Sequence, residues 1–349
     1  MGAARTSLTL APGRDYKRSM SRGAAAAAAS AAPVAAPDGL PTEEGACALC
    51  GRRDGVPLAA GPDFEYDTTR TELTLRRCTC GGVYLDPRPA PAALPRIYPS
   101  NYYAYDFVEK LGGFVMRFKS MAERAKVRVY RTYLPDGGRV LDVGCGDGHV
   151  LAQLRRHGGA SLRLEGVEFA ERAADAAERA GFTVHRGRIE DVALPAGAFD
   201  VVIMNQLIEH VADPVAVLRR IGRALRPGGH VFIETPNLDS LDARLFRRRY
   251  WGGYHLPRHF HLFDRRTLPE LARGAGLVPV ALRPLVCPQF WILSFHNWLA
   301  DRGARRLAAR LFNPLSPLWL APFTLVELVH QRVWWTSNLQ MVARREATA

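Results

Sequence analysis

The sequence predicts an α/β fold in which a mostly parallel sheet is covered by helices on both faces. Two observations support this. From Arg139 onward, short apolar runs alternate with longer segments of helical character, as expected when crossover helices join parallel strands. The first of these runs, residues 139–143, leads directly into a glycine-rich turn, which is typical of the ligand-binding edge of such a sheet.

The elements follow in chain order. Strands are expected at residues 139–143, 162–168, 182–185, 199–204, 230–234, 278–283 and 339–344. Helices are expected at residues 114–133 and 148–157, in the alanine-rich segment that ends at residue 180, and at residues 214–225 and 266–275. Asp213 followed by Pro214 combines a capping residue with proline at the first helical position. The glycines after Pro227 predict where that helix stops.

The chain of 349 residues divides into four regions by composition. Residues 1–40 are rich in alanine, proline, serine and glycine, and are predicted to be a disordered tail. The other predicted regions are a cysteine module at 41–92, a helical lid or linker at 93–134, and a main domain at 135–349 with insertions at 236–265 and 285–335.

The formal net charge is +13, and nearly all the basic residues are arginine. This bias is explained either by genomic base composition or by an anionic partner. No segment reaches the roughly 18 apolar residues of a membrane-spanning helix, and the alanine-rich start is too weakly apolar for a secretory signal. A cytoplasmic protein is therefore expected, either free or peripheral at the membrane.

Four of the six cysteines form two close pairs, Cys47 with Cys50 and Cys78 with Cys80. Pairs of this kind favour a tetrahedral zinc site over disulfides. The second pair has one intervening residue where two are usual, so a degenerate module without metal and a redox role stay open as alternatives. Cys145 and Cys287 stand alone and are interpreted as structural.

The strongest single motif is Leu141-Asp142-Val143-Gly144-Cys145-Gly146-Asp147-Gly148. Its Gly-x-Gly-x-Gly spacing differs from the Gly-x-Gly-x-x-Gly of a dinucleotide site. Glu168 ends the next strand, where a carboxylate can accept ribose hydroxyls. Asp142 suits a cationic ligand and opposes a pyrophosphate, so the motif favours S-adenosylmethionine (SAM) over NAD. The alternative is that the glycines serve only the turn.

Residues 139–283 resemble the class I SAM-dependent methyltransferases. Beside the glycine motif, the resemblance rests on Phe199-Asp200-Val201-Val202, Glu209-His210-Val211 with Pro214, and Leu225-Arg226-Pro227-Gly228-Gly229. It implies a Rossmann-like, seven-stranded sheet. The cofactor residues it implies are Asp142, Gly144, Cys145, Gly146, Gly148, Glu168, Phe169, Glu190, Asp191 and Asn205.

Several of these residues take specific roles in the family. Asp142 and the glycines would contact the methionine half of SAM, Glu168 the ribose and Phe169 the adenine. Arg188 stands where the family often has an acidic residue, so Glu190, Asp191 or the backbone would contact the adenine amino group. At the end of the fourth strand, Asn205 and Gln206 border the methyl donor or only cap the strand.

The chain also resembles a narrower subgroup associated with cell-surface polysaccharide, lipid and secondary-metabolite pathways. The similar segments are the cysteine pairs before Val83-Tyr84-Leu85-Asp86-Pro87-Arg88-Pro89, the cluster Tyr98-Pro99 with Tyr102-Tyr103, and Trp251-Gly252-Gly253-Tyr254-His255-Leu256-Pro257-Arg258-His259. This resemblance implies a small-molecule acceptor, methylated on a hydroxyl of a sugar, a lipid-linked compound or a secondary metabolite. Methylation on carbon or nitrogen is the alternative. Asn205-Gln206-Leu207-Ile208 lacks the polar and stacking clamp that a flipped base needs, which argues against nucleic acid, and the intact glycines argue against a non-catalytic SAM-binding protein.

A hydroxyl acceptor calls for a general base, and histidine suits neutral pH. His210, His259 and His255 are the catalytic candidates, with His261 a further one, and each has a structural hydrogen bond as its alternative. Arginines 247–249 and Arg258 would either grip an anionic group of the acceptor or form a solvated basic face.

Residues 285–335 are unusually apolar and aromatic, with arginines 302, 305, 306 and 310 among them. Such a pattern fits a helix lying on a membrane surface, a lid over a lipid-like acceptor, a dimer interface or an ordinary packed cap. Three prolines and Glu327 are predicted to break the segment up. The oligomeric state stays open.

Overall fold

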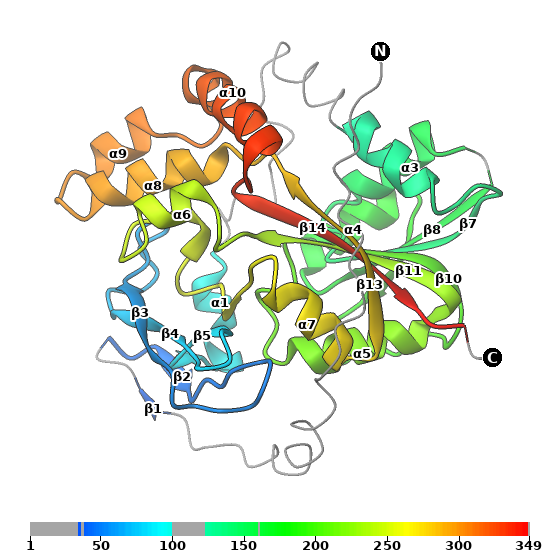
Figure 1. The fold of residues 1–349 in the computed structure, drawn as a ribbon, viewed down its shortest axis with the longest axis horizontal. Helices are drawn as coiled ribbons and strands as arrows, with labels where there is room; N and C mark the ends of the chain where they lie inside the picture. Colours follow the sequence, from blue (N-terminus) through cyan, green and yellow to red (C-terminus); the bar gives the residue numbers. More distant parts are fainter. Residues whose placement is uncertain (1–33, 36–37, 100–122, 160, 348–349) are drawn as a thin grey trace.

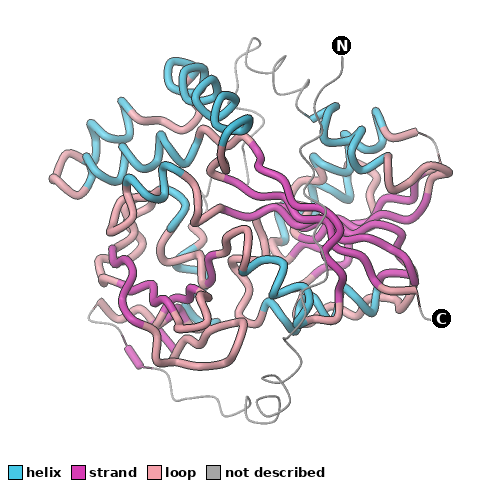
Figure 2. The backbone as a smooth tube through the Cα atoms, in the orientation of Figure 1, coloured by secondary structure: helices cyan, strands magenta, loops and turns pink. Residues whose placement is uncertain are grey.

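The structure is a computed structural model that describes residues 34–35, 38–99, 123–159 and 161–347. A seven-stranded sheet crosses its middle (Figure 1). Its strands are β7 (Gly138–Val143), β8 (Leu162–Glu168), β9 (Thr183–Arg186), β10 (Phe199–Asn205), β11 (Leu225–Pro236), β13 (Leu277–Leu285) and β14 (Asn338–Arg345). They lie in the order β13-β14-β11-β10-β7-β8-β9, and β14 runs antiparallel to both its neighbours. Figure 2 shows the sheet's twist. The predicted fold class is confirmed.

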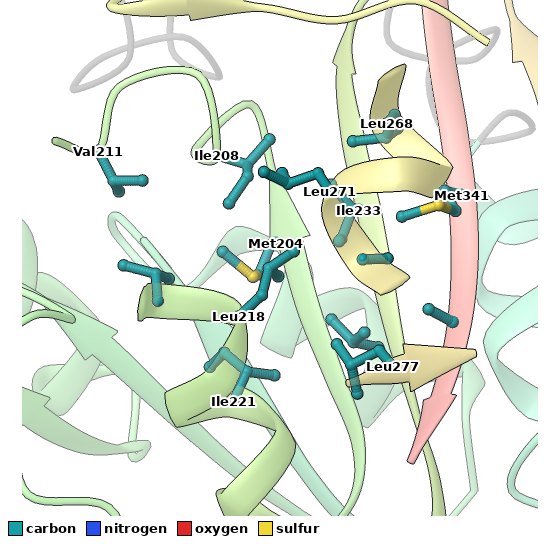
Figure 3. Close-up of a cluster of buried hydrophobic side chains, with 14 of the residues drawn as sticks. Met204, Ile208, Val211, Leu218, Ile221, Ile233, Leu268, Leu271, Leu277 and Met341 are labelled. Atoms are coloured by element: carbon teal, nitrogen blue, oxygen red, sulfur yellow. The ribbon is translucent and has the colours of Figure 1, made fainter. Parts of the chain in front are cut away.

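Helices cover both faces of the sheet because alternate residues of each strand point in opposite directions. The helices beside the sheet are α3 (His149–His157), α4 (Glu171–Arg179), α5 (Pro214–Ala224), α7 (Thr267–Gly274) and a helix at residues 123–131. On β10, Val202 and Met204 belong to the core beneath α5 and α7 (Figure 3). Val201 and Ile203 belong to the opposite core, which includes Tyr130.

The local signals for helix α5 are confirmed. The Asp213 side chain accepts a hydrogen bond from the backbone N–H of Ala216 at 2.9 Å, and Pro214 is the first helical residue. The predicted helix at residues 114–133 is present where it is described, at 123–131; residues 114–122 lie outside the described residues.

The cysteine module is joined to the main domain through its sheets. Its elements are β1 (Val34–Ala35), β2 (Pro41–Glu43), β3 (Val56–Gly61), β4 (Leu73–Arg77), β5 (Val83–Leu85), β6 (Arg88–Pro89), a 3₁₀ turn η2 (Pro91–Ala93) and α1 (Leu94–Ile97). Strand β12 (His261–Leu262), from the 236–265 insertion, pairs with β5 and completes a four-stranded sheet. Cys47 also packs in the same apolar core as Val211 of the main domain.

The boundary predicted at residue 40 differs from the structure. Val34–Ala35 pairs with β2, and the Leu40 side chain is fully buried. Leu40 is buried because it packs in the apolar core of the module. Residues 1–33 of the predicted tail lie outside the described residues.

The C-terminal insertion folds into helices at one end of the molecule (Figure 1). These are α8 (Gln289–Ala300), α9 (Arg305–Leu311) and α10 (Pro317–Val333), and α8 contacts α6 (Leu241–Leu245) and a 3₁₀ turn η4 (Gly252–Tyr254). The expectation that Pro322 and Glu327 break the segment is wrong, because α10 continues through both. Among the described helices, none combines the length and apolarity needed to cross a membrane.

Buried Glu327 explains how α10 tolerates a carboxylate. Its oxygens accept hydrogen bonds from Trp291 Nε1 at 3.0 Å and from the Ser337 hydroxyl at 2.9 Å. The backbone N–H groups of Cys287 and Ser337 donate to it as well. Paired in this way, a buried carboxylate fastens α10 to α8 and to the start of β14.

Candidate active site

The glycine turn brings the backbone close to the C-terminal edge of the sheet. Gly144 and Gly146 have φ angles of 75° and 55°, values that favour glycine. The Gly144 N–H donates to the Val167 carbonyl at 2.8 Å, which ties the turn to β8. A Cβ atom on Gly144 would lie 3.3 Å from a Leu207 methyl, so a larger residue would intrude on the edge where a ligand binds.

Two carboxylates flank this turn. Glu168 accepts backbone hydrogen bonds from Gly146 at 2.9 Å, Phe169 at 2.9 Å and Ala170 at 2.8 Å, which fix its position. Asp142 is buried, and burial, with the nearby charges of Glu168 and Glu234, raises its pKa to about 7. The site is therefore short of positive charge, and a cationic ligand would favour the ionised form of Asp142.

A cavity of about 410 Å³ opens at this edge of the sheet. Eight of the predicted cofactor residues line it: Asp142, Gly144, Cys145, Gly146, Glu168, Phe169, Glu190 and Asn205. Gly148 does not, because it starts α3 and its Cα faces the Phe182 ring. Asp191 also lies outside the lining and is exposed, so Glu190, paired with Arg188 at 2.8 Å, is the acidic residue that faces the cavity.

The three predicted histidines His210, His255 and His259 line the same cavity. The rings of His210 and His259 are 4.6 Å apart between centroids, and those of His255 and His259 are 5.0 Å apart. His261, in β12, does not line the cavity. Its Nε2 lies 3.4 Å from the Ala212 carbonyl oxygen. The 236–265 insertion therefore brings two of its three histidines to the cofactor edge.

His210 presents a neutral imidazole to the cavity. Its Nδ1 lies 3.1 Å from the Arg258 carbonyl and 2.9 Å from the Tyr98 hydroxyl. In the tautomer in which Nδ1 donates to the Arg258 carbonyl, Nε2 keeps its lone pair. Burial lowers the pKa of His210 to about 3, so the ring is neutral near pH 7.

Glu209 lies directly behind these histidines. Its Oε2 accepts a hydrogen bond from Thr235 at 3.0 Å, while Oε1 has no hydrogen-bond partner among the described residues and lies 4.0 Å from His259 Nε2. Burial raises the pKa of Glu209 to about 8. Potential metal-ligand atoms of Glu209, His210 and His259 lie within 4.8 Å of one another, so these three side chains could together coordinate a metal ion. Glu209 is part of the family motif Glu209-His210-Val211, but the sequence alone assigned it no role.

Aromatic and apolar residues complete the cavity, and sequence reasoning did not place them there. Tyr98 lines it from α1's C-terminal end, with its ring 6.2 Å from that of Phe169. Phe290 and Leu293 line it from α8. The aromatic cluster around Tyr98 could have indicated that this segment lines the cavity. Its other tyrosines, at 102, 103 and 105, lie outside the described residues. Only the fold shows that α8 reaches the site.

The expectation that insertion arginines grip an anionic acceptor is wrong for two of them. Arg258 is fully buried and forms an ion pair with Asp63 at 2.6 Å, so it is not on a solvated face either. Arg249 is paired with Asp301 at 3.0 Å and with Glu72 at 2.7 Å. The ion pairs of Arg258 and Arg249 connect the insertion to the cysteine module, and the pair of Arg249 with Asp301 connects it to the end of α8. Arg247 and Arg248 are exposed, and none of the four lines the cavity.

We expect Arg258→Met to destabilise the protein by about 3–5 kcal/mol, because it leaves the Asp63 carboxylate buried without its cation. Chemical denaturation measures this, with the exposed Arg248→Met as the matched control, expected within about 0.5 kcal/mol of wild type. Equal stability of the two variants would show that the buried pair does not hold the module.

The four cysteines form one cluster. Sγ of Cys47 lies 3.4 Å from that of Cys80, Sγ of Cys50 lies 3.5 Å from that of Cys78, and all four atoms lie within 4.8 Å of one another. A tetrahedral zinc ion with Zn–S bonds of about 2.3 Å separates its sulfurs by about 3.8 Å, which these positions accommodate. The second cysteine pair, with its single intervening residue, lies in a turn. In this turn the Cys78 N–H donates a hydrogen bond to the Gly82 carbonyl at 2.8 Å.

Comparison with known proteins agrees with this geometry. Residues 117–282 match the model of a methyltransferase domain family. The chain is 35% identical over 164 residues to the ubiquinone biosynthesis O-methyltransferase of Ralstonia nicotianae, covering 43% of this chain and 66% of that protein, just under two thirds. It is 33% identical over 178 residues to the protein of that name from Cereibacter sphaeroides, covering 48% of this chain and 69% of that protein.

Among solved structures, the chain is similar to the 1,6-didemethyltoxoflavin-N1-methyltransferase of Burkholderia thailandensis, which holds S-adenosylhomocysteine. The TM-score is 0.46 at 18% identity, covering 78% of this chain and 96% of that one. The glycine turn, the strand order and the relatives identified by sequence lead to one conclusion. The chain belongs to the class I SAM-dependent methyltransferases.

Proposed function

We propose that the protein transfers the methyl group of SAM to a hydroxyl oxygen of a small-molecule acceptor. The observation that carries this proposal is the single cavity in which the glycine turn and the carboxylates Asp142 and Glu168 meet His210 and His259. The two relatives described above are named O-methyltransferases, which supports an oxygen acceptor.

SAM supplies a methyl group activated by a positive sulfur. Asp142 and the turn would hold its methionine half, and Glu168 its ribose. Methyl transfer is an in-line displacement: the bond from the acceptor oxygen to the methyl carbon forms as the carbon–sulfur bond breaks, so the main contribution of the chain is alignment. His210 Nε2 would take the hydroxyl proton, and Phe290 and Leu293 would keep water from the reacting atoms.

The acceptor class is proposed to be a sugar, lipid-linked or secondary-metabolite hydroxyl. A second cavity, of about 1120 Å³, shares Asn205, Gln206, Phe290 and Leu293 with the cofactor cavity, and this volume suits an acceptor larger than a simple metabolite. Methylation on carbon or nitrogen is the alternative outcome of the test that follows.

The test is methyl transfer from SAM labelled with ¹³C in the methyl group, using lipid and aqueous extracts of the producing cells as acceptor pools. The chemical shift of the labelled methyl carbon in the product distinguishes bonds to oxygen, nitrogen and carbon. We expect an O-methyl product that the Gly144→Val variant does not form. An N-methyl or C-methyl product would contradict the oxygen assignment.

We also propose that the four cysteines hold a structural zinc ion. Elemental analysis of purified protein should give about one zinc per chain. Cys47→Ser should lose the metal and destabilise the module, because zinc binding contributes to folding. Cys287→Ser, which changes a half-buried cysteine outside the cluster, is the control and should retain zinc. A wild-type protein that is stable without metal would contradict the proposal.

A further inference from the structure

Helix α10 presents an apolar stripe to solvent. Leu318, Leu325, Val329 and Val333 are 73%, 63%, 54% and 72% exposed. Their spacing of seven, four and four residues places them on one face of the helix. A contiguous exposed apolar face of this kind is rare on monomeric soluble proteins and marks an interaction surface.

Exposed arginines lie on α10 and on the preceding helix α9. On α9, Leu307 and Leu311 are exposed beside Arg306 and Arg310, and Arg332 is exposed near the end of α10. Within the described part of the chain these three arginines have no ion-pair partner. The acidic residue of α10, Glu327, is 1% exposed and bonded inward. The surface of α9 and α10 is therefore both apolar and cationic.

The same surface continues beyond α10. The guanidinium of Arg244, on α6, lies 5.1 Å from the ring centroid of Trp334, which is 47% exposed. Leu245 of α6 is exposed beside it. A tryptophan and leucines next to arginines suit the boundary between lipid headgroups and acyl chains. Figure 1 shows α9 and α10 on the outside of the molecule, with α8 nearby.

This surface is connected with the active site. The cavity of about 1120 Å³ is lined by Ala309 of α9, by Phe312 and by Leu328 of α10, and also by Asn205 and Gln206 of the cofactor edge. An amphipathic molecule taken up at α9 and α10 would find a largely apolar path to the site of methyl transfer.

We propose that α6, α9 and α10 dock the protein on an anionic phospholipid bilayer. Interfacial binding requires exposed apolar area and unpaired cations, and the exposed residues of α9 and α10 supply both. A second copy of the chain fits this surface less well, because two-fold pairing would bring the arginine-rich surface against a copy of itself. Docking goes beyond the proposed methyl transfer and does not depend on it.

The experiment is co-sedimentation of the full chain with vesicles of phosphatidylcholine alone or mixed with phosphatidylglycerol. We expect binding to the mixed vesicles, weakened by added salt. Each arginine near an anionic surface strengthens binding about fivefold. The triple variant Arg306→Gln, Arg310→Gln, Arg332→Gln should therefore bind about 100-fold more weakly. Leu318→Ser with Leu325→Ser should also weaken binding.

The matched control removes the same charge from β8 and α4, through Arg163→Gln, Arg172→Gln and Arg179→Gln, which are all exposed and outside both cavities. It should bind vesicles as wild type does. Equal loss in both triple variants, or no vesicle binding by wild type, would overturn the proposal. So would a dimer in light scattering that Leu325→Ser converts to monomer, because a second copy would then cover this face.

Discussion

Asp142→Asn is expected to weaken SAM binding by at least about 100-fold while leaving the protein folded. Removing one partner of a buried charge pair costs roughly 3–5 kcal/mol, which corresponds to that loss of affinity. Asparagine keeps the shape of the side chain and removes a buried carboxylate whose pKa burial raises to about 7, so the free energy of unfolding should not fall. Titration calorimetry with SAM measures the affinity.

The same carboxylate predicts how binding depends on pH. Below pH 7, Asp142 increasingly carries a proton, and the protonated form cannot pair with a cationic ligand. The affinity of wild type should therefore fall by about tenfold for each pH unit below about 7, and Asp142→Asn should lack this dependence. Asp191→Asn, the same change at an exposed residue outside the cavity, is the control and should behave as wild type. Wild-type affinity in Asp142→Asn would contradict the assignment.

His210→Ala is expected to lower kcat by about 10²–10⁴-fold, the usual contribution of a general base, with SAM affinity unchanged. When Nδ1 of His210 donates to the Arg258 carbonyl, Nε2 keeps a lone pair that can take the proton of the acceptor hydroxyl. The measurement is turnover with the acceptor identified by the labelling experiment, together with a SAM titration of the variant.

His255→Ala is the comparison for this prediction. His255 lines the same cavity, but its Nδ1 lies 2.8 Å from Glu65 Oε2, so we expect a structural contribution and a smaller loss of kcat. Should His210→Ala keep wild-type turnover while His255→Ala or His259→Ala loses it, the base would be one of the insertion histidines instead.

Features set by neighbouring residues could be predicted from the sequence. The turn after β7, the capping of α5 by Asp213 and the position of Glu168 at the end of β8 each depend on a few consecutive residues. The prediction of seven strands succeeded for the same reason, because each strand is a short apolar run with its own turn signals.

Features set by distant residues could not be predicted in this way. Arg258 was expected to grip an anionic group of the acceptor or to lie on a solvated basic face. Its partner Asp63 lies 195 positions away in the sequence, and only the folded chain brings them together. Glu327 was expected to interrupt a helix, whereas its bonds to Trp291 and Ser337 make its burial possible. Tyr98 reaches His210 by the same kind of long-range packing.

Direct titration of the wild-type protein with SAM, S-adenosylhomocysteine and NAD tests the account most directly. One molecule of SAM should bind per chain, S-adenosylhomocysteine should displace it, and NAD should give no heat of binding. Binding of NAD in place of SAM, or no binding of SAM or S-adenosylhomocysteine, would contradict a glycine turn and carboxylates that bind a positively charged sulfur.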